Sequence, residues 1–341
     1  MKSRGTFVAA LLCVVVIAIS GGGISVFSRV SAPVRNFEFT YVTKIPPLPG
    51  DAKSSRIWIP LPQSDAYQAI SDLKIDSSFP YATHRDSEYG NEYVYLEIPT
   101  TKLAGAAEVR VHFQAARQEH HVAVEGAPNV TNSEDREAHA GDLKRFLEPD
   151  RRVPLAGTIA ELSAQETHGI QDPMAKARAI YDYVLATMRY DKSGTGWGNG
   201  DAIWACTAKR GNCTDFHSLF IGMMRAAGIP ARFEIGFSLP EEQHSAAIAG
   251  YHCWAEFYLP RYGWIPVDAS EAWKHPEKRN YFFGTHDDNR VQFTVGRDIR
   301  LDPAQRGEPL NYFIYPYAEV DGKPLALESK FSFQDRLASS D

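Results

Sequence analysis

Hydrophobic and polar residues alternate along the first part of the chain that follows residue 33. The clearest alternating runs are residues 37–41, 57–59, 93–97 and 109–113. A period of two is typical of strands with one buried face, and proline, glycine, asparagine and aspartate separate the runs as turns would. We therefore expect residues 33–126 to form a small all-β domain, an antiparallel sheet or sandwich.

Helical spacing replaces this alternation further along. A polar stretch with two short helical segments, 142–147 and 159–167, occupies residues 127–172 and is interpreted as a linker. Asp172 followed by Pro173 is typical of a helix start, with an N-cap and proline at the first helical position. A second folded domain should begin there.

The strongest helical pattern begins at Cys213 and ends at Gly228 and Pro230. Its apolar face contains Phe216, Phe220, Met223, Met224 and Ala227. Strand-like runs follow at residues 232–239, 251–259, 264–268, 292–295 and 312–319. The order predicts an α+β domain over residues 173–320, with residues 321–341 as a C-terminal tail.

The N-terminus has the pattern of an export segment. Lys2 and Arg4 precede an uncharged, largely apolar stretch over residues 5–28. Its centre has the length of a signal-peptide core, and the whole stretch is about long enough to span a bilayer. We expect residues 1–32 to be a signal peptide or an N-terminal membrane anchor. The remainder should be exported, periplasmic or otherwise extracytoplasmic, and either secreted or anchored.

Charge and cysteine content limit the expected binding partners and the state of the thiols. The 341 residues suggest about two domains, and 36 basic against 42 acidic residues give a net charge of −6 without a basic stripe. Nucleic acid is therefore not an expected partner. Cys206, Cys213 and Cys253 lie beyond the export segment, so at least one thiol is unpaired in a compartment that favours disulfides. A Cys206–Cys253 disulfide that leaves Cys213 free remains open.

Cys213, His252 and Asp268 carry the candidate chemistry, each at the end of a predicted element. A free thiol is only about 3% thiolate at pH 7, so complete ionisation gains roughly 30-fold, whereas enzymes accelerate reactions at least about a million-fold. The site must therefore also protonate the leaving amine and stabilise an oxyanion. His252 supplies the acid, the Cys213 N–H supplies one oxyanion donor, and Asp268 orients the imidazole.

The hairpin between residues 251 and 268 provides a geometric test. Opposed residues in a hairpin have a constant sum of residue numbers. A sum of 523 would point Asp268 away from His252, whereas an even sum such as 522, or a bulge at Gly263, puts both on one face. We predict such a register. The alternative role for Asp268 is to cap the segment that follows it.

Four segments together resemble the core of the transglutaminase-like superfamily, which is papain-like. They are Gly211-Asn-Cys-Thr-Asp-Phe, Arg225-Ala-Ala-Gly-Ile-Pro-Ala-Arg232, His252-Cys-Trp-Ala-Glu and Gly263-Trp-Ile-Pro-Val-Asp268. The resemblance implies a helix bearing the nucleophile Cys213, packed on an antiparallel sheet bearing the base His252 and the carboxylate Asp268. More loosely, the chain is similar to exported bacterial members described as cysteine proteases.

The resemblance also implies a side-chain oxyanion donor, often an upstream aromatic residue. Tyr190, Trp197 and Trp204 are the candidates, and Trp254 is expected in the wall of the cleft. Cys253 departs from the family pattern, since many relatives carry a small or apolar residue there.

The remaining polar residues near these segments are expected to support the site or to have structural roles. His217, one turn after Cys213, is on the side that approaches it and could support the site. Asp215 is interpreted as structural. His120 and His121 are interpreted as a solvated pair rather than metal ligands. No metal and no cofactor is expected.

These observations predict acyl transfer at an amide bond of a peptide or protein through a thioester. Hydrolysis, as in a cysteine peptidase or amidase, is favoured because a crosslinking enzyme must exclude water. Transglutaminase-type crosslinking is the first alternative. A binding or scaffold module of the cell envelope that retains the three residues without turnover is the second.

Overall fold

Two five-stranded antiparallel sheets form the β-rich part of the computed structural model, which describes residues 34–48, 51–99, 105–124 and 143–336. The first sheet contains, in spatial order, β11 (Ser245–Ile248), β18 (Glu328–Asp335), β1 (Val34–Ile45), β6 (Ala107–Gln118) and β3 (Gln68–Ser77). The second contains β17 (Lys323–Pro324), β16 (Tyr317–Val320), β2 (Ser55–Pro60), β5 (Glu92–Glu97) and β4 (Ala82–Arg85).

A smaller antiparallel sheet carries the candidate chemistry. It contains β13 (Gly263–Val267), β12 (His252–Leu259), β10 (Ala231–Ser238) and β15 (Arg290–Val295). Two short pairs accompany it: β7 (His120–His121) with β14 (Thr285–His286), and β8 (Arg189–Tyr190) with β9 (Arg210–Gly211). The first pair is antiparallel and the second is parallel.

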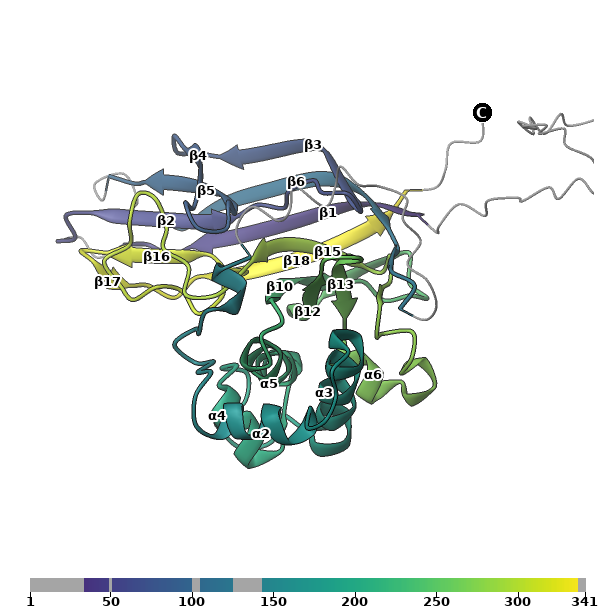
Figure 1. Cartoon of the computed structure of the whole chain (residues 1–341). Helices are drawn as coiled ribbons and strands as arrows, with labels where there is room; N and C mark the ends of the chain where they lie inside the picture. Colours follow the sequence, from purple (N-terminus) through teal and green to yellow (C-terminus); the bar gives the residue numbers. More distant parts are fainter. Residues whose placement is uncertain (1–33, 49–50, 100–104, 125–142, 337–341) are drawn as a thin grey trace, which may run out of the picture. The chain divides into compact units, whose positions relative to one another are not determined.

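The helices gather on one side of this smaller sheet (Figure 1). They are α2 (Thr158–Glu166), α3 (Pro173–Thr187), α4 (Ala202–Ala208), α5 (Cys213–Ala226), α6 (Ala269–Lys274) and the 3-10 helices η2 (Arg145–Leu147) and η3 (Pro276–Lys278). Helix α5 packs on β12 and β10 and is covered by α2, α3 and α4. Every residue from Cys213 to Arg225 is buried, so α5 is a central helix held from all sides.

One apolar core joins the large and small sheets. The ring of Phe39 in β1 lies 5.3 Å from that of Phe237 in β10 and 5.8 Å from that of Phe293 in β15. The described residues between 34 and 336 accordingly form one compact unit. The small sheet that carries the candidate site is therefore supported on one face by helices and at β10 and β15 by the aromatic side chains of the larger sheet.

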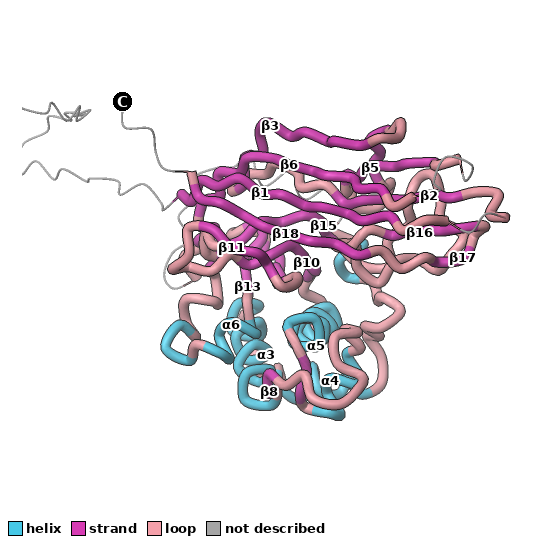
Figure 2. The backbone as a smooth tube through the Cα atoms, turned by 180° about the vertical axis from the view of Figure 1, so that it is seen from behind, coloured by secondary structure: helices cyan, strands magenta, loops and turns pink. Residues whose placement is uncertain are grey.

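The α+β class is confirmed, and one local prediction is wrong. In the predicted helical segment 142–147, the described residues contain the 3-10 helix Arg145–Leu147. The described residues 321–336 of the predicted tail are not a tail, because β18 pairs with β1 along eight positions from Phe37↔Asp335 to Lys44↔Glu328. Alternating Phe331 and Phe333 enter the core from β18, and β11 lies beside it (Figure 2).

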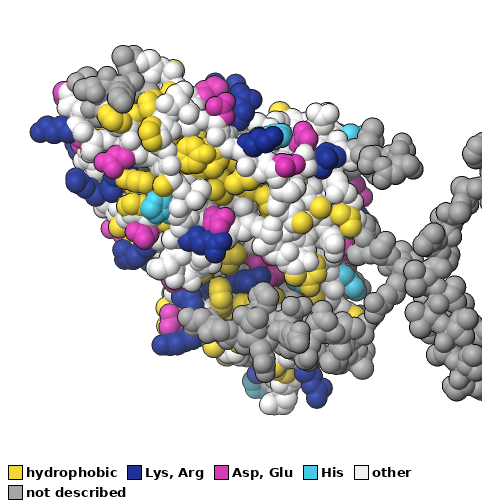
Figure 3. Space-filling model, turned by 90° about the horizontal axis from the view of Figure 1, so that it is seen from above, with side chains coloured by type: hydrophobic (Ala, Val, Ile, Leu, Met, Phe, Trp, Pro, Cys, Tyr) yellow, Lys and Arg dark blue, Asp and Glu magenta, His cyan; other side chains and the backbone are white. Residues whose placement is uncertain are grey.

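The predicted export segment, residues 1–32, lies outside the described residues, as do residues 127–142 of the predicted linker. Within the described ranges, no helix is both long and apolar enough to cross a membrane. Acidic, basic and hydrophobic side chains are interspersed on the face shown in Figure 3.

Candidate active site

Cys213 is fixed by the cap of α5. The Asn212 side chain accepts a hydrogen bond from the Thr214 N–H (3.0 Å), and the Asp215 side chain accepts one from the Asn212 N–H (3.0 Å). This reciprocal capping box satisfies amides that a helix start leaves unpaired. It also places the Cys213 sulfur at the positive end of the helix, where a thiolate is stabilised.

Asp215 also holds the glycine-rich loop that precedes the helix. Its carboxylate accepts hydrogen bonds from the N–H groups of Gly198 (2.7 Å) and Gly200 (3.0 Å). Gly211 has a φ of +152°, and a Cβ there would lie 2.3 Å from the Asp215 carboxylate, so only glycine fits. The structural role expected for Asp215 agrees with these contacts.

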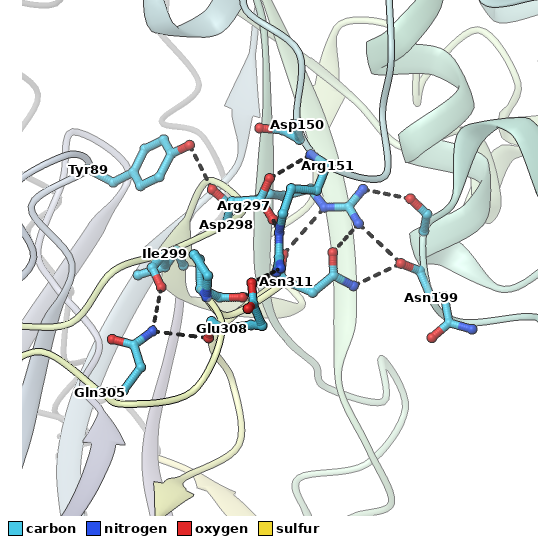
Figure 4. Close-up of polar contacts among 12 residues, drawn as sticks. Tyr89, Asp150, Arg151, Asn199, Arg297, Asp298, Ile299, Gln305, Glu308 and Asn311 are labelled. Atoms are coloured by element: carbon cyan, nitrogen blue, oxygen red, sulfur yellow. Dashed lines mark hydrogen bonds and ion pairs between the residues drawn. The ribbon is translucent and has the colours of Figure 1, made fainter. Parts of the chain in front are cut away.

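Arg297 fixes the other side of the same loop. Its buried guanidinium donates to the carbonyl oxygens of Gly200 (2.8 Å) and Asn199 (3.1 Å) and to the Ser218 hydroxyl (2.6 Å) on α5. Asn311 also donates to the Asn199 carbonyl, at 2.8 Å (Figure 4). The loop beside Cys213 is therefore tied to the helix, and no motif around Arg297 indicated this role.

The hairpin has the predicted even register. Ala255 pairs with Val267 and Leu259 with Gly263, so both pairs sum to 522. The Tyr262 N–H donates to the Leu259 carbonyl (2.9 Å), and Gly263 follows with a φ of +77°. This is a three-residue turn closed by a left-handed glycine. It brings the end of β13 to the same face as His252.

His252 and Asp268 form a buried hydrogen bond. Nε2 of His252 lies 2.7 Å from Oδ2 of Asp268, and the residues are 5% and 0% exposed. Oδ1 of Asp268 accepts from the Glu271 N–H (3.0 Å) and the Ser270 hydroxyl (3.1 Å). Asp268 thus contacts the imidazole and caps α6 at once, so the two roles considered for it coexist.

Arg290 completes the surroundings of Asp268 and was missed from the sequence. Its Nη1 lies 3.2 Å from Oδ2 of Asp268, and its Nε and Nη2 each lie 3.2 Å from Asp287. The guanidinium also stacks 4.7 Å from the Trp254 ring. An arginine in a strand gives no sequence signal for such a partner, because the contact depends on how β15 is placed against the end of β13.

The three groups favour a charged thiolate–imidazolium pair. Burial alone raises the pKa of Cys213, but hydrogen bonds with Cys253 and His252 and the charge of His252 hold it well below its usual range. Burial lowers the pKa of His252, but Asp268 and the Cys213 thiolate raise it to about 10. Burial raises the pKa of Asp268, and His252 and Arg290 bring it well below its usual range.

His217 links the helix to the carboxylate segment. Its Nε2 accepts a hydrogen bond from the Ala269 N–H (3.1 Å) and lies 3.6 Å from Oδ1 of Asp268. Its ring also bonds the Cys213 carbonyl, and burial lowers its pKa. A neutral His217 with both ring nitrogens engaged sets the spacing between Cys213 and Asp268. These contacts agree with the supporting position expected for it.

The four aromatic candidates differ in what their polar atoms do. Trp254 is fully buried and donates its indole N–H to Glu234 (2.7 Å), so its expected place in the cleft wall is wrong. Trp197 donates its indole N–H to the Gly194 carbonyl (3.1 Å). Trp204 stacks on Arg210. Tyr190, which pairs with Gly211, has its pKa raised by burial and by the nearby charges of Cys213 and Cys253.

Tyr251 and Cys253 flank the thiol and were not assigned roles from the sequence. The Tyr251 hydroxyl lies 3.0 Å from the Asn212 side chain and 2.8 Å from the Thr214 hydroxyl. Cys253 lies 3.6 Å from the Thr214 hydroxyl and bonds the Cys213 sulfur. Cys206, Cys213 and Cys253 are all free thiols, so the Cys206–Cys253 disulfide is not formed.

One other polar cluster is buried beside the small sheet. His120 is 4% exposed and its Nδ1 lies 3.1 Å from a carboxylate oxygen of Glu256. The interpretation of His120 as part of a solvated pair is therefore wrong, although His121 beside it is exposed. His120, Glu256 and His286 together are residue types that hold metal ions.

Comparisons with known proteins agree with this architecture. The sequence model of the transglutaminase-like superfamily matches residues 160–269. An uncharacterised Haemophilus influenzae protein is 30% identical over 324 residues, covering 85% of this chain and 87% of the relative. The uncharacterised Bacillus subtilis protein YebA is 30% identical over 145 residues, which cover 37% of this chain and 20% of YebA.

A solved structure matches the fold over most of its length. The structure of a candidate cysteine protease from Cytophaga hutchinsonii has a TM-score of 0.61 at 17% identity, and the match covers 91% of this chain and 94% of that one. The central helix packed on the small antiparallel sheet is a cysteine-based catalytic module. The chain belongs to the transglutaminase-like superfamily.

Proposed function

We propose that the chain is a thiol-dependent amide hydrolase in which Cys213 is the nucleophile, His252 the acid and base, and Asp268 the orienting carboxylate. The observation that carries this proposal is the 2.7 Å contact between His252 and Asp268 beside a helix-capped Cys213 whose pKa is lowered. Because Asp268 occupies Nε2 of His252, Nδ1 is the nitrogen left for the thiol.

The reaction would proceed in two balanced steps. The Cys213 thiolate attacks the amide carbonyl carbon, and a C–S bond forms. His252 gives its proton to the leaving nitrogen as the C–N bond breaks, so an amine departs and a thioester remains. A water molecule then gives one proton to His252 and attacks the thioester carbon, so a C–O bond forms. The C–S bond breaks, the carboxylic acid leaves, and the thiolate–imidazolium pair is restored.

Two donors would stabilise the oxyanion in each step. The hydrogen bonds of the Asn212 cap involve the N–H groups of Thr214, Asp215 and Phe216 and leave the Cys213 N–H out of the cap. The Tyr190 hydroxyl is the side-chain donor we favour. Its raised pKa keeps it protonated, and it lies close enough for the Cys213 charge to affect it.

Hydrolysis of peptide or protein amides is favoured over crosslinking, as argued from the sequence. Transglutaminase-type transfer to an amine remains the alternative for the same thioester. We further propose that the chain works outside the cytoplasm, secreted or attached to a membrane through residues 1–32. The export-like pattern of those residues supports this proposal.

Alkylation kinetics test the ion pair. In a Cys13→Ser, Cys206→Ser background, which removes the N-terminal thiol and the partly exposed one, iodoacetamide should label Cys213 at a rate that is nearly constant across neutral pH. His252→Ala should lower the rate at pH 7 by about 30-fold, the factor between a full thiolate and an ordinary thiol. His275→Ala, at the exposed residue that follows α6, is the matched control. Equal rates with and without His252 would contradict the ion pair.

Turnover needs its own experiment, because a scaffold module could retain the same pair. The wild type and Cys213→Ala are compared on a library of peptide amides, with and without an added primary amine. A thioester adduct and a carboxylate product in the wild type alone would support hydrolysis. Amine incorporation would favour crosslinking. Absence of any adduct with an electrophilic amide probe would favour the scaffold alternative.

A further inference from the structure

Three side chains of types that can bind metal ions converge around Glu256, which lies four residues after His252 in β12. Glu256 extends from β12, His120 from β7 and His286 from the neighbouring strand β14, directly opposite His120. One ligand atom from each lies within 4.8 Å of the other two, and all three residues are buried. Three different segments thus bring two imidazoles and one carboxylate to a single point.

His286 is the unusual member of this cluster. It is 0% exposed, and neither its Nδ1 nor its Nε2 has a hydrogen-bond partner among the described residues. A buried polar atom without a partner costs free energy. A metal ion bound to one of these nitrogens would give the ring the polar partner that it lacks.

The two carboxylate oxygens of Glu256 have different partners, which orients the carboxylate. One carboxylate oxygen lies 3.1 Å from Nδ1 of His120, close to the roughly 3.4 Å that separates two ligands of a tetrahedral zinc. The other oxygen accepts a hydrogen bond from Nε of Arg232 at 2.9 Å. Outer hydrogen bonds of this kind orient ligating carboxylates. One oxygen of Glu256 can therefore bind an ion while Arg232 fixes the other.

A cavity gives access to the cluster. Its volume is about 510 Å³, and His120, Glu256, Tyr67 and Arg232 are among its lining residues. None of Cys213, His252 and Asp268 lines it. Two of the three converging residues therefore face a space that could hold a fourth ligand.

We propose that His120, Glu256 and His286 form a site for one divalent transition-metal ion of the zinc class. Two imidazole nitrogens and one carboxylate oxygen suit zinc and its neighbours rather than calcium or magnesium, which select oxygen ligands. The fourth position is directed to the cavity, as in zinc sites with three protein ligands. The ion links β12 to the β7–β14 pair and satisfies His286.

Zinc titration of the full chain tests the site. Cys213→Ala is the background, because a thiolate beside His252 would bind zinc by itself. About one zinc per chain should remain after dialysis, and magnesium should not compete for it. His286→Ala and His120→Ala should each weaken binding at least 100-fold in a chelator competition. His121→Ala is the matched control and should retain the affinity, since His121 is exposed and bonds Thr285.

Cobalt substitution keeps the test decisive if His286→Ala does not fold. The cobalt form of the Cys213→Ala chain should show ligand-field bands of a low-symmetry site without a thiolate charge-transfer band. A thiolate band would assign the metal to Cys206 or Cys253 and overturn the proposal. Absence of zinc binding, or equal affinity in His120→Ala and the background, would overturn it as well.

Discussion

Strand β12 presents two histidine-containing clusters on one face, and they differ in how completely their polar atoms are paired. At His252, the ring bonds Asp268 and both nitrogens of the neighbouring His217 are engaged. At Glu256, four residues along the same strand, His286 has no hydrogen-bond partner among the described residues. A closed network holds a proton in a defined place, whereas unpaired imidazole nitrogens are suited to an ion.

The pKa of the buried histidine is shifted in opposite directions in the two clusters, upward for His252 and downward for His286. Burial acts against the imidazolium in both, but contact with Asp268 raises the pKa of His252 to about 10. His286 has no such contact, and burial with the nearby charge of Arg290 holds its pKa well below the usual range. The hydrogen bond to Asp268 therefore distinguishes His252 from His286.

Removal of the carboxylate charge should give the largest effect. Asp268→Asn should lower kcat/KM for the proposed amide hydrolysis by about 10³–10⁴-fold, since the imidazole loses both its orientation and its counter-charge. Asp287→Asn is the matched control, because Asp287 bonds Arg290 rather than the imidazole. A similar loss in both variants would mean that the fold of this region, rather than the His252 contact, had been damaged.

The pH profile separates these outcomes further. In the wild type the thiolate–imidazolium pair exists above the lowered pKa of Cys213 and below the pKa of His252, about 10. Activity should therefore be flat across neutral pH, with an alkaline limb near 10. In Asp268→Asn the pKa of His252 loses its support while burial still lowers it, so the alkaline limb should move down. An unchanged limb would contradict the assigned coupling.

The cluster of Cys213, His252 and Asp268, called here the closed cluster because its polar atoms are paired, was largely predictable from the sequence. Cys213 lies where a capped helix starts, and the hairpin from 251 to 268 offered two registers, of which only the even one brings Asp268 beside His252. Local rules decide both features, since the cap is set by Asn212 and Asp215 and the register by the turn that ends at Gly263. The fold class followed from the same periodicities.

The cluster of His120, Glu256 and His286, called here the open cluster, was not predictable from the sequence. The contacts of Arg290 and Arg297 were not predictable either. Glu256, His120 and His286 come from three distant segments, so no spacing could relate them. Arg290 and Arg297 reach their partners through the placement of β15 and the segment after it. Residues 328–335 were assigned to a tail because they follow the catalytic module, whereas their alternating phenylalanines belong to the first sheet.

Tyr190→Phe should have the next largest effect on the closed cluster. Loss of a single oxyanion donor costs about 10²–10³-fold in kcat in other acyl-transfer enzymes, and we expect about 10²-fold here with little change in KM. The iodoacetamide rate should stay unchanged, because alkylation forms no oxyanion. Tyr183→Phe on α3 is the control hydroxyl. An equal kcat in Tyr190→Phe and the wild type would return the role to Trp197 or Trp204, the other candidate donors.

Arg290→Gln should affect the two clusters in opposite directions. Asp268 and Asp287 would lose a buried cation, so we expect activity to fall about tenfold, with partial recovery in Arg290→Lys. The proposed metal site would lose a nearby repulsive charge, so its zinc affinity should rise about three- to tenfold. Activity is measured as kcat/KM and affinity by chelator competition. Changes of the same sign in both would indicate a general loss of structure.

Cys253→Ala should have the smallest effect, because it removes one neighbour of the Cys213 thiol and leaves His252 in place. The Cys253 thiol bonds the Cys213 sulfur and contributes to its lowered pKa, but the contacts and charge of His252 remain without it. The pKa of Cys213 should therefore rise modestly, and iodoacetamide labelling should slow about two- to fivefold at the acid end of its profile while it stays unchanged at alkaline pH. The rates are compared in the same background without the Cys206 thiol, with Cys253 present or replaced. A loss as large as that in His252→Ala would mean that the thiol neighbour, rather than the imidazole, stabilises the thiolate.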